Sequence, residues 1–231
     1  MSSHSLAVTG LELAHGAAVD PLLAEHIPLI AMTAGEMLPE PDVVRGGDGW
    51  LAYRVPGPYD RYPGVDVLVA RTSGAPGGRV DGSRLSPWRQ IHCMANLLCQ
   101  GCGAPAARLH GAGVLWVRSE FQKSGQRTSA TGLTDMPPSC ARCALRWCPV
   151  LAKQGRQLVF AGEAEEVGVF ATVYPPPRGT AVPEQLVRWE DEPRITASLA
   201  TRLVRDLQKV TRTNREAVAR LVERTARQRS H

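Results

Sequence analysis

Two cysteine pairs constrain the fold of this chain more than any other sequence feature. Cys99 and Cys102 are separated by two residues, and so are Cys140 and Cys143. A Cys-x-x-Cys turn directs two sulfur atoms to one point, and two such turns provide the four soft, tetrahedral ligands that suit Zn²⁺. The 37 residues between the pairs are tolerable, because loop-closure entropy grows slowly with length. We therefore predict a structural Zn²⁺ site at Cys99, Cys102, Cys140 and Cys143.

The spacing leaves other interpretations of these cysteines open. They could be unligated core side chains, or they could hold an iron centre, which spacing alone does not distinguish from zinc. A structural four-cysteine site has no open position for a substrate or water, so it does not support metal catalysis. Cys93 and Cys148 are predicted to be small buried hydrophobes, and His92 and His110 are spare ligand candidates.

The elements around the cysteines predict an α+β fold with a treble-clef-like zinc core and a small antiparallel sheet. Ser86 and Pro87 have the residue types that begin a helix, and its apolar face leads directly to Cys99. A strand is expected at 114–118, and a second helix from Cys140. Gly103, like Gly101, suits a turn that needs a positive φ. Further strands are expected at 50–55, 65–71 and 186–189, with an exposed loop at 73–83 and a hairpin of 158–161 and 167–174 around an acidic turn at 162–166.

The C-terminal region is predicted to be helical. Apolar residues recur there in steps of four, four, four and three, which favours a helix with one apolar stripe; they are Ile195, Leu199, Leu203, Leu207 and Val210. Thr213 and Glu216 match a capping box that restarts a helix. We therefore divide the chain into an N-terminal α/β region with a loop (1–83), a zinc-binding core (84–192) and a basic helical arm (193–231).

The excess positive charge of the chain lies in this arm. Residues 194–231 contain ten basic and three acidic residues, a net charge of +7, whereas the remaining seventeen basic and nineteen acidic residues sum to −2. Such polarity favours an acidic partner, of which nucleic acid is the commonest. The candidate contacts are arginines on one face of the last helix and on the expected zinc helix: Arg220, Arg224, Arg227, Arg142 and Arg146.

Other functions remain open for the same segment. Glu216–Arg220 and Glu223–Arg227 are i,i+4 pairs that would suit a solvated surface helix. The basic face would also suit an acidic protein, and the apolar stripe would suit a homodimer or heterodimer through the C-terminal helices.

Three segments resemble a group of four-cysteine proteins of actinobacteria and their phages. They are LCQGCG at 98–103, GVLWV at 113–117 and PPSCARCALRWCP at 137–149. A wider resemblance is to treble-clef nucleases of the HNH type, whose second cysteine pair is typically followed by a catalytic histidine. Here Ala144 stands at that position, and residues 103–139 contain one histidine, His110, and no asparagine. The resemblance therefore implies a nuclease-like fold without the nuclease chemistry, or a degenerate nuclease.

The remaining sequence features favour a non-enzymatic protein of the cytoplasm. No phosphate-binding loop, dinucleotide-binding glycine motif or nucleophile elbow is present, and we expect no small-molecule cofactor. Residues 1–19 lack the basic start of a secretory signal, and the most apolar window, 21–38, is interrupted by charges and Pro28. We therefore expect no membrane association, reduced thiols, and a zinc-stabilised nucleic-acid-binding protein that could act in regulation.

Overall fold

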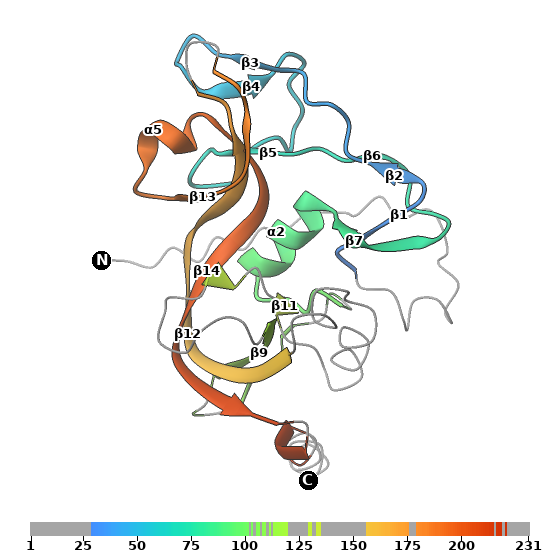
Figure 1. Cartoon of the computed structure of the whole chain (residues 1–231), viewed down its shortest axis with the longest axis vertical. Coiled ribbons are helices and arrows are strands. Elements are labelled where there is room, and N and C mark those ends of the chain that lie inside the picture. Colours follow the sequence, from blue (N-terminus) through green and yellow to red (C-terminus); the bar gives the residue numbers. More distant parts are fainter. Residues whose placement is uncertain are drawn as a thin grey trace.

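Strands dominate the described part of the chain, and its helices are short (Figure 1). The computed structural model describes residues 29–101, 103, 105–106, 108–109, 111, 113–119, 129–130, 133–134, 156–175, 179–214, 216–218 and 220. The helices are α2 (Pro87–Ala95), α5 (Glu192–Ile195) and a helical turn at 216–218 and 220. The strands are β1 (Ala31–Thr33), β2 (Glu36–Met37), β3 (Val43–Arg45), β4 (Leu51–Tyr53), β5 (Leu68–Val69), β6 (Ser73–Gly74), β7 (Val80–Leu85), β8 (Arg108–Leu109), β9 (Gly113–Ser119), β10 (Ser129–Ala130), β11 (Leu133–Thr134), β12 (Arg156–Val173), β13 (Val182–Arg188) and β14 (Ser198–Thr213).

Two long antiparallel strands, β12 and β14, form the spine of the molecule. Their register runs from Leu158 opposite Thr213 to Val173 opposite Ser198. They belong to an eight-stranded sheet with the order β10-β14-β12-β9-β11, in which β13 pairs with β12, β5 with β14 and β8 with β9. In Figure 1 the two strands run along the long axis, with β9 and the helical turn after β14 toward the lower end. The small pairs β1–β7, β2–β6 and β3–β4 lie outside this sheet.

Composition explains why both strands are so long. Val and Phe recur along β12, and β14 combines Leu, Val and Thr with no Gly or Pro. Register shifts fall between Glu166 and Gly168 and between Phe170 and Ala171. Gly168 has a φ of +157°, and a Cβ there would lie 2.1 Å from the carbonyl oxygen of Val187 on β13. Glycine therefore lets three strands approach closely at this irregular point.

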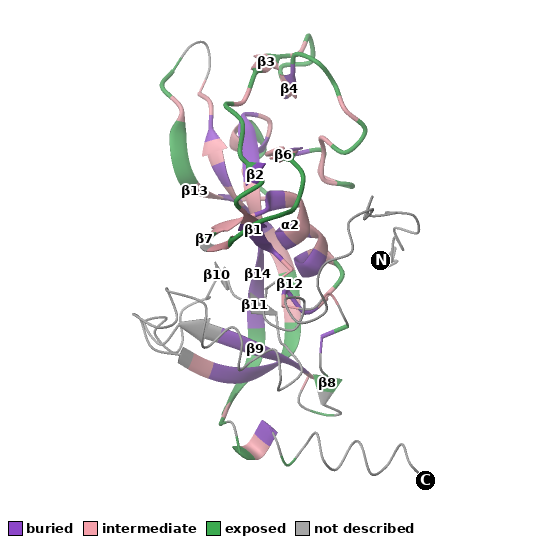
Figure 2. Ribbon diagram, turned by 90° about the vertical axis from the view of Figure 1, so that its right-hand side faces the viewer, coloured by how far each residue is buried: buried purple, intermediate pink, exposed green. Residues whose placement is uncertain are grey.

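Helix α2 and the sheet enclose the main hydrophobic core. The apolar face of α2 supplies Ile91 and Met94, which pack in one cluster with Leu203 and Leu207 of β14. The core extends through Val159 of β12 to Trp116 of β9, which is fully buried. Figure 2 shows the buried residues as a band along the sheet and beneath α2. The core therefore follows the length of the sheet.

The predicted fold class is wrong. The described residues form a mostly β protein with a large sheet, not an α+β protein with a small sheet around a treble-clef-like core and C-terminal helices. Residues 198–213, which we expected to be helical, form β14. Because four is even, residues four apart share one side of a strand as well as one face of a helix. The spacing of the leucines was therefore compatible with both structures.

The expected apolar stripe lies inside this chain. Leu203 and Leu207 belong to the main core, whereas Leu199 packs in a second cluster with Leu51 and Leu68. Ile195 is also buried, and only Val210, at 36% exposure, faces solvent. These leucines therefore pack within the chain and do not form an exposed stripe.

The acidic turn at 162–166 is also absent, because β12 continues through it as one strand. Strand β14 is also continuous here and pairs with Ala161 and with residues 163–166, so the chain does not reverse. Within the expected loop at 73–83, β6 and most of β7 form strands.

Several predicted elements are confirmed. Helix α2 begins at Pro87 after Ser86, and strands lie within or around the segments expected at 50–55, 65–71, 114–118 and 186–189. A helical turn follows β14, but its cap is Asn214, one residue after the expected Thr213. Asn214 Oδ1 accepts the Ala217 N–H at 2.8 Å, and its carbonyl oxygen accepts the Val218 N–H. None of the described helices has the length and apolar character needed to cross a membrane.

Candidate metal centre and nucleic-acid interface

The first cysteine of the predicted zinc site lies on a tight turn immediately after α2. Leu97, at a φ of +50°, redirects the chain as the helix ends. The chain then reverses, because Leu98 forms an antiparallel bridge with Pro105 and the Ala106 N–H donates to the carbonyl oxygen of Leu97 at 2.9 Å. Cys99 stands at the start of this reversal and is fully buried.

The turn at Cys99, which we call the knuckle, is closed by backbone hydrogen bonds. Its Sγ accepts the backbone N–H of Gly101 at 3.3 Å. Its carbonyl oxygen accepts the N–H of Gly103 at 2.8 Å, and Gly103 has the positive φ, +74°, that we expected. An N–H aimed at a sulfur stabilises the thiolate, which is the form that binds metal. The turn therefore favours a ligating sulfur at Cys99 before any metal is considered.

The knuckle is held from its other side by the N-terminal segment. The N–H groups of Leu29 and Ile30 donate to the carbonyl oxygens of Gly101 and Gln100, at 2.9 and 3.2 Å. Gln100 is 2% exposed, and a Cβ on Gly103 would lie 3.0 Å from the Leu29 side chain. This packing fixes the conformation of the turn, and with it the direction in which Cys99 Sγ points.

The other predicted ligands, Cys102, Cys140 and Cys143, lie outside the described residues, as do His110 and Cys148. Among the described residues, no group of three or more His, Cys, Asp or Glu side chains could hold a metal ion. Cys93 is buried in α2, as expected, with its Sγ 4.0 Å from the carbonyl oxygen of Cys99. His92 lies near the end of α2, 3.4 Å from the amide nitrogen of Asn96. Zinc binding therefore stays a prediction.

Gln90 connects the helix before the knuckle to β14. The buried Gln90 amide accepts the Leu203 N–H at 2.8 Å and donates to the Leu203 carbonyl oxygen at 3.2 Å. These bonds occupy the stretch of the β14 edge between its pairings with β5 and β10. A side-chain amide thus takes the place of a neighbouring strand.

Arg205 forms a second connection between β14 and α2. Its guanidinium donates to the carbonyl oxygens of Met94 and Ala95 at the end of α2, at 2.8 and 2.9 Å. It also contacts Glu166 of β12 at 2.5 Å, and the other Glu166 oxygen accepts the Tyr62 hydroxyl at 2.7 Å. Burial lowers the pKa of Arg205, and the charge of Glu166 opposes that shift. Arg205 therefore has a structural position and is not free to contact a partner.

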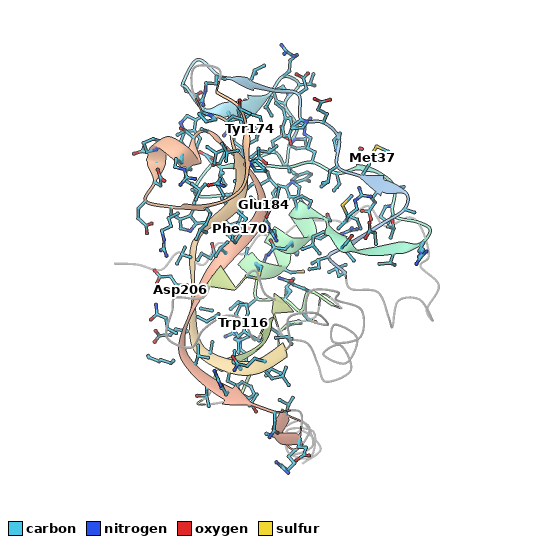
Figure 3. The ribbon with its side chains drawn as sticks, viewed as in Figure 1. Met37, Trp116, Phe170, Tyr174, Glu184 and Asp206 are labelled. Atoms are coloured by element: carbon cyan, nitrogen blue, oxygen red, sulfur yellow. The ribbon has the colours of Figure 1, made fainter. Side chains whose placement is uncertain are left out.

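Two further arginines of the basic arm are also held within the upper part of the molecule. Arg194 contacts Asp191 at 3.4 Å. Arg202 pairs with Glu184, and its guanidinium carbon lies 4.9 Å from the Phe170 ring centroid. Figure 3 labels Glu184 and Phe170 in this part of the molecule. The charge asymmetry of the sequence therefore overstates what this arm presents to a partner.

Only one of the five arginines predicted to contact nucleic acid lies among the described residues. Arg220 is exposed, and its nearest Nη is 4.0 Å from Glu216, in the expected i,i+4 arrangement. Arg142, Arg146, Arg224 and Arg227 lie outside those residues.

The sheet brings together basic residues that are dispersed in the sequence. Its lower part consists of β8, β9, the start of β12 (156–164) and the end of β14 (207–213), which pairs with it. These stretches contain one acidic residue, Glu163, and five basic residues; the five are Arg108, Arg118, Arg156, Lys209 and Arg212. We call this region the basic end of the sheet. Sequence reasoning missed Arg108, Arg118 and Arg156, because only the strand register makes them neighbours.

The register places these residues on four adjacent strands. Arg108 is level with Val114, Ala161 and Val210, whereas Arg156 pairs with Ser119 at the far end of β9. Arg108 and Arg212 are exposed, whereas Lys209 pairs with Glu163 on the neighbouring strand. The remainder of β12, residues 165–173, contains Glu165 and Glu166 and no basic residue, and Glu166 pairs with Arg205 of β14.

Comparisons with protein-family models, curated proteins and solved structures yield no match to this chain.

Proposed function

We propose that this chain is a non-enzymatic, zinc-stabilised nucleic-acid-binding protein, and that the basic end of the sheet contacts the phosphates. The observation that supports this most is the charge of that end, where five basic residues lie on adjacent strands with a single acidic residue, Glu163. The following helical turn adds exposed Arg220. Arginine suits this role because its guanidinium can bind phosphate through two parallel hydrogen bonds.

Buried side chains on both faces of the sheet hold the strands of the basic end in place. Trp116, Leu115 and Val159 are each at most 1% exposed. The strands therefore keep their spacing, and little backbone entropy is lost when phosphates are bound.

Zinc has a structural role in this proposal. Cys99, Cys102, Cys140 and Cys143 would hold the ion, and the knuckle at Cys99 leads to β8, and so to Arg108, within nine residues. A closed four-cysteine site contributes folding energy and offers no position for a substrate. Because its thiolates must stay reduced, the proposal places the protein in the cytoplasm.

Salt-dependent binding of a random-sequence duplex tests the nucleic-acid part. Each phosphate contact lowers log K by about 0.9 per unit of log salt, so the combined Arg108→Gln and Arg212→Gln variant should weaken binding and reduce the slope by about 1 to 2. The matched control combines Arg54→Gln and Arg79→Gln, two exposed arginines away from the basic end. Equal effects of the two double variants, or binding without salt dependence, would contradict the proposal.

Metal analysis of the purified protein tests the zinc part separately. Wild type should contain one Zn²⁺ per chain, and Cys99→Ser should lose both the ion and thermal stability. Cys93→Ala is the matched control, because Cys93 is equally buried but is not a predicted ligand, and it should retain the ion. Full zinc content in Cys99→Ser would exclude the site.

A further inference from the structure

We infer that the outer edge of β13 pairs with the same edge of a second copy of this chain, so that the protein forms a two-fold dimer with a continuous sheet. This surface lies away from the basic end and does not depend on the proposed function. Two observations carry the inference, namely the open backbone groups of β13 and the order of the charges along it.

The outer edge of β13 is open in the described part of the chain. Strand β13 pairs with β12 on one side, and no described strand pairs with its other side (Figure 2). The Trp189 N–H donates to the Val167 carbonyl oxygen at 3.2 Å, and Arg188 lies opposite Gly168 of β12. Backbone groups alternate in direction along an antiparallel strand, so those of Leu186 point away from β12. Neither the Leu186 N–H nor its carbonyl oxygen has a partner among the described residues.

The opposite edge of this part of the sheet is covered by the chain itself. Beside β14, Gln90 occupies the stretch between the pairings with β5 and β10. Beside β5, Arg61 forms a bridge with Leu68, and the Val69 N–H donates to the Asp60 carbonyl oxygen at 2.7 Å. An unpaired strand edge is a template for pairing with another chain, and here it is β13 that offers one.

The order of the charges along β13 fits a second copy in antiparallel orientation. When Leu186 lies opposite Leu186 of the second copy, each Glu184 lies opposite an Arg188. Registers centred on Glu184 or on Arg188 would instead place like charges opposite each other, which is destabilising. Arg188 has no ion-pair partner among the described residues, and the Glu184 side chain is 64% exposed beside Arg202, so each can accept a partner across the edge.

The side chains next to this edge suit partial burial by a second copy. Leu186 lies opposite Phe170 of β12, and both are half-buried. Val187 and Val169 point to the other face, into the main core, where Ile195 of α5 also packs. Helix α5 is therefore on the core face. Pairing two Leu186 side chains on the outer face would remove further apolar surface from water.

Local backbone features keep the paired stretch short. Pro183 has no N–H, and Glu184 has a positive φ, +53°, so regular pairing ends there. We expect a dimer that dissociates on dilution, because stable interfaces bury about 1,200 Å² or more. Since each copy uses its open edge and the opposite edge is covered, the assembly stops at two copies.

Sedimentation velocity of the full-length protein over a range of concentrations tests the dimer. Wild type should shift from monomer to dimer as the concentration rises. Leu186→Pro should stay monomeric, because it removes the N–H that points away from β12 while the β12–β13 bonds need no N–H at this position. Leu186→Ala is the matched control, because it keeps this N–H, and it should still dimerise.

Two single charge reversals test the register. Glu184→Arg alone and Arg188→Glu alone should each stay monomeric, because like charges then face each other at both ends of the paired stretch. An equimolar mixture of the two variants should form a heterodimer, because every acidic residue of one copy then lies opposite a basic residue of the other. Recovery in the mixture also shows that both variants are folded.

Each result decides for or against this interface. A wild type that stays monomeric at its highest soluble concentration overturns the inference, and so does a dimer that Leu186→Pro leaves intact. A mixture of the charge variants that stays monomeric, although both have thermal unfolding curves like that of wild type, also overturns it.

Discussion

A single buried side chain, Gln90, replaces a strand at the open edge of β14. Its two bonds to the Leu203 backbone lie where neither β5 nor β10 reaches. A buried backbone group without a partner costs about 1–3 kcal/mol. Gln90→Leu leaves two such groups, so we expect the free energy of unfolding to fall by about 2–4 kcal/mol in urea denaturation. The exposed Gln208→Leu should change it by less than about 0.5 kcal/mol, and equal effects would contradict this role.

Glu36 makes stability dependent on acid pH. It is 5% exposed, accepts the Thr33 N–H at 2.9 Å and pairs with Arg89 at 2.9 Å. Burial raises the pKa of Glu36, but the bonds from Arg89 and Thr33 outweigh burial, so the pKa lies below its usual 4.5. The carboxylate is therefore stabilised by folding, and this contribution is present above pH 4.5 and is lost as the pH falls below it.

Glu36→Gln should remove this pH-dependent contribution. At pH 7 we expect its free energy of unfolding to be about 2 kcal/mol below wild type, because a charged hydrogen-bonded group is lost. The gap should narrow as the pH is lowered below 4.5. Urea denaturation across this range measures it, with the exposed Glu40→Gln as the control. A gap that is constant with pH would show that Glu36 acts by shape alone.

At the scale of single residues, the sequence predicted what depends on local chemistry. The burial of Cys93, the positive φ of Gly103 and the helix start at Pro87 follow from residue type and immediate neighbours. The buried Arg205 was not predictable in this way, because its partners lie 39 to 111 residues away in the chain. The same holds for the basic end of the sheet, which exists only through strand register.

At the scale of elements, local sequence patterns predicted the wrong structure for parts of β12 and β14. The apolar steps of four in β14 fit a strand and a helix equally, and its helix-compatible Leu, Arg and Gln did not decide between them. The acidic residues 163–166 suggested a turn, but pairing with β14 keeps them extended. In both cases long-range pairing outweighs local preference, which one sequence does not reveal.

Two aspartate substitutions distinguish the strand from the expected helix. Leu203 is fully buried and Val210 is 36% exposed, whereas the expected helix would have placed both on one apolar stripe. Leu203→Asp should lose more than about 4 kcal/mol of unfolding free energy, because it buries an unpaired charge, and Val210→Asp should lose less than about 1 kcal/mol. Urea denaturation and size-exclusion chromatography measure both. If both variants only dissociated a dimer and stayed folded, the account of β14 as a core strand would be wrong.

At the scale of the whole molecule, the knuckle, α2 and β14 form one connected path. Cys99 follows α2 by four residues, and Gln90 and Arg205 fix α2 to β14, whose end carries Lys209 and Arg212. The glutamates of β12 lie in the middle of the sheet, at 163–166, whereas the exposed Arg108 and Arg212 lie toward its lower end. We therefore expect a phosphate backbone to bind toward the lower end, away from these glutamates.

Hydrogen exchange measured by mass spectrometry, with and without a saturating duplex, locates this contact directly. We expect slower amide exchange in peptides that cover 108–119, 156–161 and 207–220, and unchanged exchange in peptides from 43–74. Protection confined to 43–74, or no change anywhere under conditions where the duplex is bound, would contradict the account.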